Sequence, residues 1–458
     1  MASMTVENLT LAVAKRVCAV DFKDLDSDTR TMTKQLIADG VAVAIAGSLE
    51  EPPRILAQYA QDLSSAPRAS VWGFGFKTHP AQAAFVNAAS MHVLDFEPMS
   101  NPPTHAVSPT VPVAFALAEH LHANGAQILT ACAKGFEMQG RVLIAADPKR
   151  GSLPFHTPGV IGVMGSTVAA AHLLGLAALP LSHALGIATS RCSGLSANTG
   201  SMVKCTHCGQ VAAAGLEAAT LAAKGFSANP DIFSAAHGYI ATFFKDHFNE
   251  ALLLDYANPH RCVDPGMAIK FYPSKYPTHF VIAAALEAHE RRKAGSKITA
   301  IRIITPEITD ANRPQPRLGL EGKFSFQYVA AAALLDGVID IRTFTDERRF
   351  KPDMVDLLSK IKLEYDVSIP KDTRRMHVVV EVSLDNGEQI RCVCRKPPGT
   401  WGEPIPAALH QNKILDCLQL RLSANNASEV MDRLDQLETL DANEVVQLSA
   451  LLSNSSMD

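Results

Sequence analysis

Hydrophobic residues recur at helical spacing through the first part of the chain. From Asn8 to about Gly266 the sequence is rich in Ala and Leu, and the clearest helical patterns cover 113–122, 165–176 and 210–223. Gly and Pro punctuate this region, and it contains no convincingly long alternating strand pattern. We therefore predict a large, mostly α-helical domain over residues 1–266.

The pattern changes after Pro265, where alternation and β-branched residues become frequent. The expected elements are strands at 297–308 and 376–395, a hairpin turn at Asp385-Asn386-Gly387, and helices at 325–339 and 351–363. This predicts a smaller α+β domain over residues 267–400.

A Pro/Gly-rich segment at 395–406 marks the exit from that second domain. The remaining helical patterns, within 401–458, would most economically return to the first domain. The expected fold class is mostly α, with a smaller α+β domain inserted into a large helical one.

One segment is long and uncharged enough to be considered for a membrane span. No Asp, Glu, Lys or Arg occurs between Arg150 and Arg191. Pro and Gly interrupt this segment repeatedly, starting at Pro154, and it carries three histidines. It therefore predicts two short helices buried on all sides rather than a span.

Composition excludes some partners. The 458 residues are 47% hydrophobic and 19% charged, with a net charge of −4. Such a chain lacks the basic field that holds nucleic acid or an anionic membrane. An anionic ligand would have to be held by a few local cations.

The N-terminal sequence and the cysteines bear on the compartment. The first 26 residues have neither a hydrophobic signal core nor an Arg-rich, acid-poor targeting pattern. Nine scattered cysteines do not resemble the disulfide framework of a small secreted domain. We expect a cytoplasmic protein with reduced thiols.

The stretch 92–109 is the first candidate for chemistry. His92 and Asp95 lie three residues apart at an expected helix end, and three prolines then extend the chain before His105. Such a loop could present Asp95 and His105 to one cavity. In the alternative interpretation Asp95 caps a helix and His105 packs against its neighbour.

Two further stretches place cations or histidines beside small residues. His156 precedes a Gly-rich helix start, where free N–H groups and the helix dipole suit a carboxylate, although a buried structural histidine fits equally well. Lys204 and His207 lie in a small-residue loop before a nearly uncharged helix.

Cys205 and Cys208 suggest a zinc site, but a lone C-x-x-C needs a second pair of ligands. Cys392 and Cys394 lie in a strand pattern and are weak partners. We predict no metal site.

Lys270 lies among apolar and aromatic residues at the domain boundary, either as a hinge-surface residue or as a cation facing a cleft. Tyr328 lies in the first turn of an expected helix, where a tyrosine usually belongs to the core. The P-loop, H-E-x-x-H and G-x-S-x-G motifs are missing from the sequence. The residues alone indicate a two-domain enzyme with an anion-sized cleft lined by His and Lys.

Taken as an ordered set, several blocks identify the chain as similar to the MmgE/PrpD family over about residues 8–420. The blocks are AAFVNAASMHVLDF, THAVSPTVPVAFALAE, FEMQGR, FHTPGVIGVMGS, MVKCTHCGQVAAAG, IKFYPSKYPTH and FSFQYVAAAALLDG. Within the family, FEMQGRVL, NRPQP and LLSKIKLEY most resemble members that decarboxylate cis-aconitate to itaconate.

The resemblance implies a helical domain built from both chain ends, an inserted lid domain, a homodimer, and chemistry without a metal or organic cofactor. It implies a carboxy-lyase acting on cis-aconitate or an alkylated analogue. The alternative is a dehydratase of 2-methylcitrate or another 2-alkylcitrate, and an epimerase or an inactive binding protein comes after that.

The resemblance also assigns site residues. The implied catalytic residues are Asp95, His105, Lys204, Lys270 and Tyr328, and the implied substrate-binding residues are Met99, His156 and His207. In our hypothesis His105 donates the proton, assisted by Asp95 or Tyr328, and the two lysines stabilise negative charge.

The chain departs from the family pattern at two places. Glu97-Pro98-Met99 stands where an acid pair and Thr are common, and Lys275 stands where Cys is usual. Met99 removes a hydroxyl group and leaves an apolar side chain, so that an alkyl-bearing tricarboxylate becomes a candidate substrate.

Overall fold

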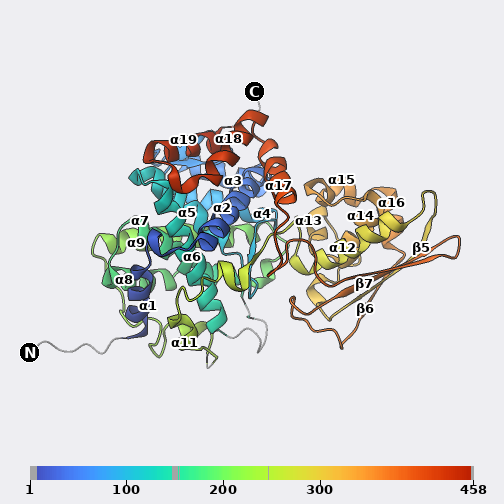
Figure 1. The fold of residues 1–458 in the computed structure, drawn as a ribbon, viewed down its shortest axis with the longest axis horizontal. Coiled ribbons are helices and arrows are strands. Elements are labelled where there is room, and N and C mark those ends of the chain that lie inside the picture. Colours follow the sequence, from blue (N-terminus) through green and yellow to red (C-terminus); the bar gives the residue numbers. More distant parts are fainter. Residues whose placement is uncertain (1–7, 147–152, 154, 246, 455–458) are drawn as a thin grey trace, which may run out of the picture. The chain divides into compact units, whose positions relative to one another are not determined.

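The computed structural model describes residues 8–146, 153, 155–245 and 247–454, and divides the chain into two compact units. Unit 1 comprises the chain up to Val93, then Glu97–Ile269, and the chain from Pro406 onward. Unit 2 comprises Leu94–Phe96 and Lys270–Ile405. The predicted fold class, mostly α with a smaller α+β domain, is confirmed (Figure 1).

Unit 1 is built almost entirely from helices. Its elements are α1 (Leu9–Ala19), α2 (Ser27–Gly47), α3 (Glu51–Asp62), β1 (Ala69–Val71), β2 (Phe76–Thr78), α4 (Pro80–Val93), β3 (Met99–Ser100), α5 (Val107–Leu121), α6 (Gly125–Ala145), α7 (Thr157–Leu173), α8 (Ala178–Thr189), α9 (Val203–Ala223), α10 (Tyr239–Phe243), α11 (Glu250–Leu254), β4 (Met267–Ala268), α17 (Ala407–Gln419), α18 (Ala424–Asp435) and α19 (Ala442–Ser453).

The core of unit 1 is a group of helices packed around α7. Helices α5, α6 and α9 pack directly against α7, and α4 packs against both α5 and α9. Because α7 has no charged residue and is buried almost throughout, its burial accounts for the uncharged segment of the sequence. None of the described helices combines the length and apolarity that a membrane crossing requires.

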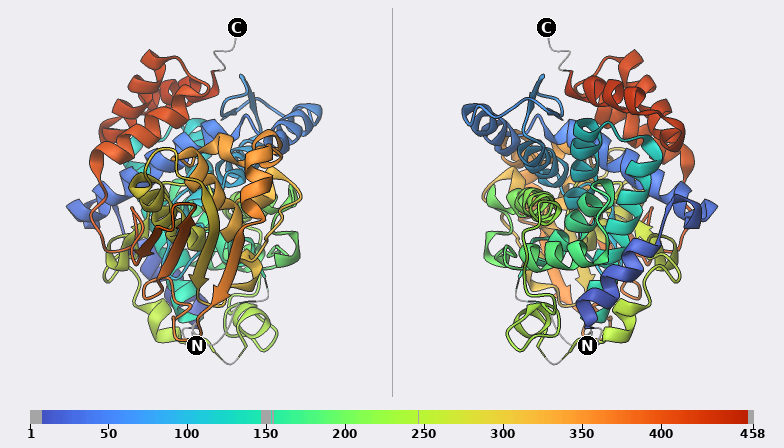
Figure 2. Two further views of the ribbon diagram at one scale, coloured as in Figure 1. Left: turned by 90° about the vertical axis from the view of Figure 1, so that its right-hand side faces the viewer. Right: turned by 90° about the vertical axis from the view of Figure 1, so that its left-hand side faces the viewer.

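The C-terminal helices pack against elements from the first part of the chain within unit 1. Helices α17 and α18 pack against α2, and α19 packs against α5 and β1. The blue helix α2 accordingly lies beside the red C-terminal helices in Figure 1, and Figure 2 shows these helices from two further sides. A buried ion cluster joins α2 to α17, in which Asp39 accepts from Lys413 at 2.8 Å and contacts Nε2 of His410 at 3.0 Å.

Unit 2 contains one sheet with helices packed on it. Its helices are α12 (Tyr276–Arg291), α13 (Gly319–Gly322), α14 (Phe326–Asp336), α15 (Asp346–Arg349) and α16 (Pro352–Leu358), and its strands are β5 (Ile298–Thr305), β6 (Ile361–Tyr365), β7 (Val378–Leu384) and β8 (Gln389–Cys394). The sheet order is β6-β5-β7-β8, with β6 parallel to β5 and the other pairs antiparallel. Helix α12 packs on β7 and β8 (Figure 1).

One predicted element is wrong in its second half. The helix expected at 351–363 ends at Leu358, and Ile361–Tyr365 forms strand β6. The segment alternates between half-buried and exposed residues, and pairing with β5 satisfies its backbone. The predicted hairpin joins β7 to β8, and Gly387 adopts a left-handed conformation with φ 83° in its turn.

Candidate active site

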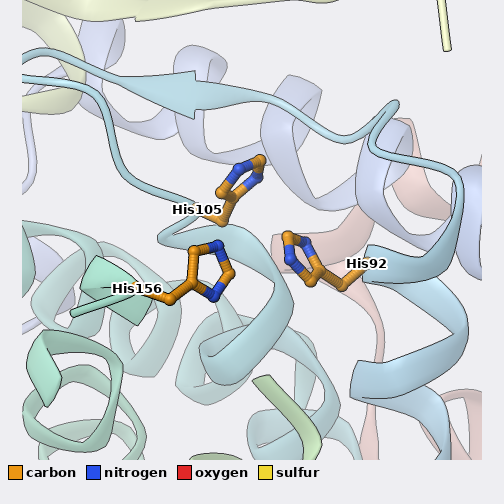
Figure 3. A group of neighbouring side chains, drawn as sticks. All are labelled: His92, His105 and His156. Atoms are coloured by element: carbon orange, nitrogen blue, oxygen red, sulfur yellow. The ribbon is translucent and has the colours of Figure 1, made fainter. Parts of the chain in front are cut away.

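Four histidines from separate parts of the sequence meet in unit 1. His92 lies near the end of α4, His105 lies just before α5, His156 is the N-cap of α7, and His207 lies in the first turns of α9. Ring centroids are 4.4 Å apart for His92 and His105, 5.4 Å for His92 and His156, and 5.1 Å for His156 and His207. Figure 3 shows His92 and His156 approaching each other from opposite sides, with His105 beside them.

The carboxylate of Glu97 contacts two of these rings. Its Oε1 atom is 2.5 Å from Nδ1 of His92 and 2.9 Å from Nδ1 of His105, and it accepts a hydrogen bond of 2.8 Å from the hydroxyl of Ser108. The side chains of His92 and Glu97 are both 0% exposed. Oε2 of Glu97 is buried and has no hydrogen-bond partner among the described residues.

Lys204 approaches the cluster from the first turn of α9. Its Nζ atom donates to Nε2 of His92 across 3.1 Å. The close packing of α4 against α9 makes this contact possible, because Gly209 lies so near Phe85 that a Cβ there would meet the Phe85 carbonyl oxygen at 2.6 Å. His92 thus lies between a buried carboxylate and a buried ammonium group.

The position of His156 depends on another glycine. The N–H of His156 donates to the carbonyl of Gly194, and the N–H of Ser193 donates to the carbonyl of Gly159. A Cβ at Gly159 would lie 1.9 Å from the Ser193 carbonyl oxygen, so only glycine permits this approach. Nδ1 of His156 lies 3.0 Å from Nδ1 of His207 as a result. Pro154, the start of the predicted turn, lies outside the described residues.

Burial keeps the rings of His92 and His156 neutral. Desolvation, followed by the charge of Lys204, lowers the pKa of His92 to about 3 and holds that of His156 well below its usual value. Burial raises the pKa of Glu97, but its contacts with His105 and His92 outweigh this and hold it well below the usual range. The cluster therefore contains an anionic Glu97 and neutral His92 and His156 rings.

Asp95 and Lys270 form a buried pair in unit 2. Nζ of Lys270 donates to the Asp95 carbonyl oxygen at 2.9 Å and also contacts the Asp95 carboxylate. Lys323 donates to the preceding carbonyl, that of Leu94, at 3.3 Å. Asp95 has φ 53°, a left-handed conformation that Asp tolerates better than most residues. Neither Lys270 nor Asp95 is a surface residue.

Tyr328 also belongs to unit 2, where it is completely buried in α14. Its hydroxyl donates to the Thr343 carbonyl oxygen at 2.5 Å, and burial raises its pKa well above the usual value. This is the environment of a core tyrosine, so the catalytic role assigned to Tyr328 remains a prediction. Lys275, at the N-cap of α12, forms an ion pair with Asp310.

Met99 is buried in unit 1, where β3 pairs with β4 so that Met99 lies opposite Ala268. Its role toward a substrate stays a prediction. The same holds for the joint presentation of Asp95 and His105, since these residues belong to different units.

The donor set fits an anion better than a metal ion. Ring nitrogens of His92, His105 and His156 lie within 4.8 Å of one another, a separation compatible with a three-histidine metal site. Both nitrogens of His92, however, already contact Glu97 and Lys204, and the ammonium group of Lys204 would repel a cation at Nε2. Among the described residues, Cys205 and Cys208 belong to no group of three metal-ligating side chains.

Comparison with known proteins agrees with this architecture. Residues 12–251 match the MmgE/PrpD N-terminal domain, and residues 272–437 match the MmgE/PrpD C-terminal domain. The chain belongs to the MmgE/PrpD family.

Relatives within the family match the chain over nearly its whole length. A cis-aconitate decarboxylase of Mus musculus is 30% identical, covering 96% of this chain and 92% of the relative. The cis-aconitate decarboxylase of Homo sapiens is 30% identical over 96% and 93%, and that of Aspergillus terreus (strain NIH 2624 / FGSC A1156) is 25% identical over 86% of each chain. The expected family and the expected enzyme class, a lyase, are confirmed.

Two residues of this cluster were missing from the predicted set. His92 was noted only as a neighbour of Asp95, and Glu97 only as a departure from the family pattern, yet both lie at the centre of the cluster. The spacing of His92, Glu97 and His105 in one proline-containing stretch was the available signal. The packing of α4 against α9, which brings Lys204 to His92, leaves no local pattern in the sequence.

Proposed function

We propose that this MmgE/PrpD protein is a carboxy-lyase that decarboxylates cis-aconitate, or an alkylated analogue, to an itaconate-type product without a metal or organic cofactor. The observation that carries the proposal is the buried cluster of Lys204, His105 and His156 in a chain similar throughout its length to cis-aconitate decarboxylases.

The chemistry of cis-aconitate suits such a cluster. The substrate is a trianion, so a buried site must supply cations and N–H donors in place of water. In unit 1, Lys204 supplies an ammonium group, and His156 lies at the positive end of the dipole of a 17-residue helix. His207 completes the polar lining beside His156.

The proposed reaction needs one charge stabiliser and one acid. The bond to the leaving carboxylate breaks, CO₂ departs, and the electron pair remains as an allylic carbanion delocalised into a neighbouring carboxyl group. A proton then adds to one carbon of this anion. We assign the proton to His105 and the stabilisation of negative charge to Lys204.

The roles proposed for Asp95, Lys270 and Tyr328 rest on the family resemblance. Lys270 would add a second stabilising cation, and Asp95 or Tyr328 would assist proton transfer. Lys270 and Asp95 contact each other in the interior of unit 2. A substitution at either residue therefore removes a contact of the other and also affects stability.

The alternative reaction is dehydration of a 2-alkylcitrate. A base would remove the proton next to a carboxylate while an acid protonates the leaving hydroxyl group. The apolar side chain of Met99, in place of the usual Thr, is the feature that favours an alkyl-bearing substrate. An epimerase or an inactive binding protein has no comparable feature in its favour.

Proton NMR distinguishes these functions. The purified protein is incubated separately with cis-aconitate and with 2-methylcitrate, and the signals of itaconate and methylaconitate are followed. Itaconate supports the proposal, and methylaconitate would replace it with the dehydratase. If neither substrate reacts, alkylated cis-aconitates are the remaining substrates to assay, and inactivity toward them would refute a catalytic role.

The proposed enzyme is a homodimer, as the family resemblance implies. Light scattering at micromolar protein concentration tests this part, and a monomeric mass would contradict it.

A further inference from the structure

The acid at position 97 has no role in the proposed reaction, yet it contacts both His92 and His105. We propose that Glu97 is a positioning residue that fixes the Nδ1-protonated form of His92 and His105, and thereby places the transferable proton of His105 on Nε2. The inference about the ring protons rests on the contacts of Glu97 together with its ionised state. Its consequence for turnover rests on the proposed function.

The first step concerns His92. An ionised carboxylate can only accept hydrogen bonds, so Nδ1 of His92, 2.5 Å from Oε1 of Glu97, must carry a proton. In a neutral ring Nε2 is then an acceptor, which is what the ammonium group of Lys204 requires at 3.1 Å. The two contacts agree on one protonation state and define a chain of donors from Lys204 through His92 to Glu97.

The second step concerns His105. Its Nδ1 lies 2.9 Å from the same carboxylate oxygen, at ion-pair distance but outside hydrogen-bond geometry, so the adjacent negative charge favours a proton on Nδ1 in this ring as well. When His105 carries two protons, Glu97 stabilises the charged ring, and the proton that can leave without breaking this contact is on Nε2. Carboxylates that hold a catalytic histidine act in the same way, and removing their charge leaves the ring in the wrong tautomer.

The third step excludes a purely structural purpose for the carboxylate. All three recorded contacts of Glu97, from His92, His105 and Ser108, fall on Oε1, while the buried Oε2 has no hydrogen-bond partner among the described residues. Leaving Oε2 without a hydrogen bond forgoes part of the stabilisation that a buried carboxylate can give. The position of Glu97 beside both rings is instead suited to fixing their orientation and keeping the proton on Nδ1 of each.

The charged and titratable groups around His105 in unit 1 define the expected effect of removing this anion. They are the carboxylate of Glu97, the ring of His92 from α4, the ring of His156 at the start of α7, and the ammonium group of Lys204 on α9. Glu97 is the one carboxylate among these four groups. Glu97→Gln removes this negative charge, and a neighbouring carboxylate favours the charged form of an imidazole.

The test uses Glu97→Gln and Glu97→Asp. Solid-state ¹⁵N NMR of protein labelled at histidine, assigned with His92→Gln and His105→Gln, reads which ring nitrogens carry protons. We expect Nδ1–H at both rings in the wild type and in Glu97→Asp, and a mixture of tautomers in Glu97→Gln. A His105 ring that carries a proton on Nε2 but none on Nδ1 in the wild type would overturn the inference, whether or not the protein is active.

Kinetics provide the second measurement, on the substrate that the NMR assay identifies. Glu97→Gln should lower kcat about 10- to 100-fold with little change in KM, and should move the basic limb of the pH profile to lower pH. Glu97→Asp should restore much of the loss. Loss of kcat with an unchanged pH profile, or no restoration by Asp, would contradict a positioning role.

Glu137→Gln is the matched control. Glu137 is another carboxylate buried in unit 1, where it accepts from Arg141 and from the backbone of Ala257 and Arg261. Its replacement should lower thermal stability while leaving the tautomers and the pH profile unchanged. If Glu137→Gln alters both in the same way as Glu97→Gln, the effect is a general loss of packing and the inference fails.

Discussion

Nζ of Lys204 lies 3.1 Å from Nε2 of His92, and this contact joins the first turn of α9 to the last turn of α4. The ring of His92 is neutral, since its pKa is lowered to about 3 by burial and by Lys204. A neutral imidazole therefore holds an ammonium group in place without cancelling its charge. In the proposed reaction, the charge remains available to the anionic substrate and to the carbanion that would form from it.

Replacing Lys204 by Met should reduce kcat/KM about 100- to 1,000-fold with the fold intact. The reason is the loss of a preorganised cation from a site that must stabilise an allylic carbanion. Steady-state assays with circular dichroism as a check on folding measure this effect.

Lys134→Met is the control for Lys204→Met. Lys134 is also buried in unit 1 and also contacts a histidine, with Nζ 3.3 Å from Nδ1 of His172. Its substitution should leave kcat/KM within a few-fold of the wild type. Equal losses in the two variants would mean that the effect is on packing and not on catalysis.

His105→Gln should reduce kcat by about two to four orders of magnitude, because glutamine cannot donate the proton that the product requires. His183→Gln is the control, since His183 on α8 contacts only the backbone at Ala228 among its recorded hydrogen bonds. Both variants are compared by the rate of product formation and by melting temperature. Near-normal turnover in His105→Gln would remove His105 from the mechanism.

The fold class could be predicted because it depends on local patterns. The uncharged α7 and the Ala-rich α9 have helical spacing, and β7 and β8 carry a strong hairpin signal. Strand β6 was missed because its five residues follow α16 directly and form a strand only by pairing with β5, a partner 60 residues away in the sequence. Tertiary pairing of this kind overrides local propensity.

The site could be predicted only in part, for a related reason. Sequence blocks identified His105, His156, Lys204 and His207, which unit 1 brings together, and Lys270, which contacts Asp95 in unit 2. The central position of Glu97 depends on the path of the loop between α4 and α5, which places its carboxylate between two rings. No spacing rule for a single loop predicts which oxygen meets which ring.

Activity should survive exhaustive treatment with EDTA and 1,10-phenanthroline. The reason is the occupied donor set of His92, whose two nitrogens already contact Glu97 and Lys204. Elemental analysis of the treated protein and the NMR assay are the measurements. Loss of activity that zinc restores would contradict this prediction and direct attention to Cys205 and Cys208.

Breaking the contact between Asp95 and Lys270 should destabilise unit 2. Lys270→Met removes the ammonium group that contacts the buried Asp95 carboxylate, and we expect a loss of about 3–5 kcal/mol in the free energy of unfolding. The double variant Lys270→Met/Asp95→Asn should lose less than the sum of the single variants. Denaturant unfolding of all three variants measures the coupling.

An ion pair in the same unit provides the comparison for this cycle. Lys275 and Asp310 also form an ion pair, but Asp310 is 63% exposed. Lys275→Met should therefore change the free energy of unfolding by only about 0–1 kcal/mol. If Lys275→Met and Lys270→Met lower the free energy of unfolding equally, burial does not increase the contribution of the Asp95–Lys270 pair to stability.

Stability should fall as the pH drops below about 6.5, the value at which histidines of an unfolded chain become protonated. His92, with a pKa of about 3 in the fold, and His156, with a pKa well below its usual value, stay neutral while the unfolded state binds protons. Each such ring lowers the free energy of unfolding by up to about 1.4 kcal/mol per pH unit. Glu97 acts in the same direction at lower pH, because its lowered pKa favours the folded state only while the unfolded carboxylate is ionised.

Urea unfolding at pH 7.5, 6 and 5 measures this dependence, and His92→Gln isolates one ring. The variant removes one proton-binding group from the unfolded state, so its stability should decline less steeply between pH 6 and 5 than that of the wild type. A wild-type stability that stays constant from pH 7.5 to 5 would mean that these rings are protonated in the fold. That outcome would also contradict the neutral ring of His92 on which the contact with Lys204 depends.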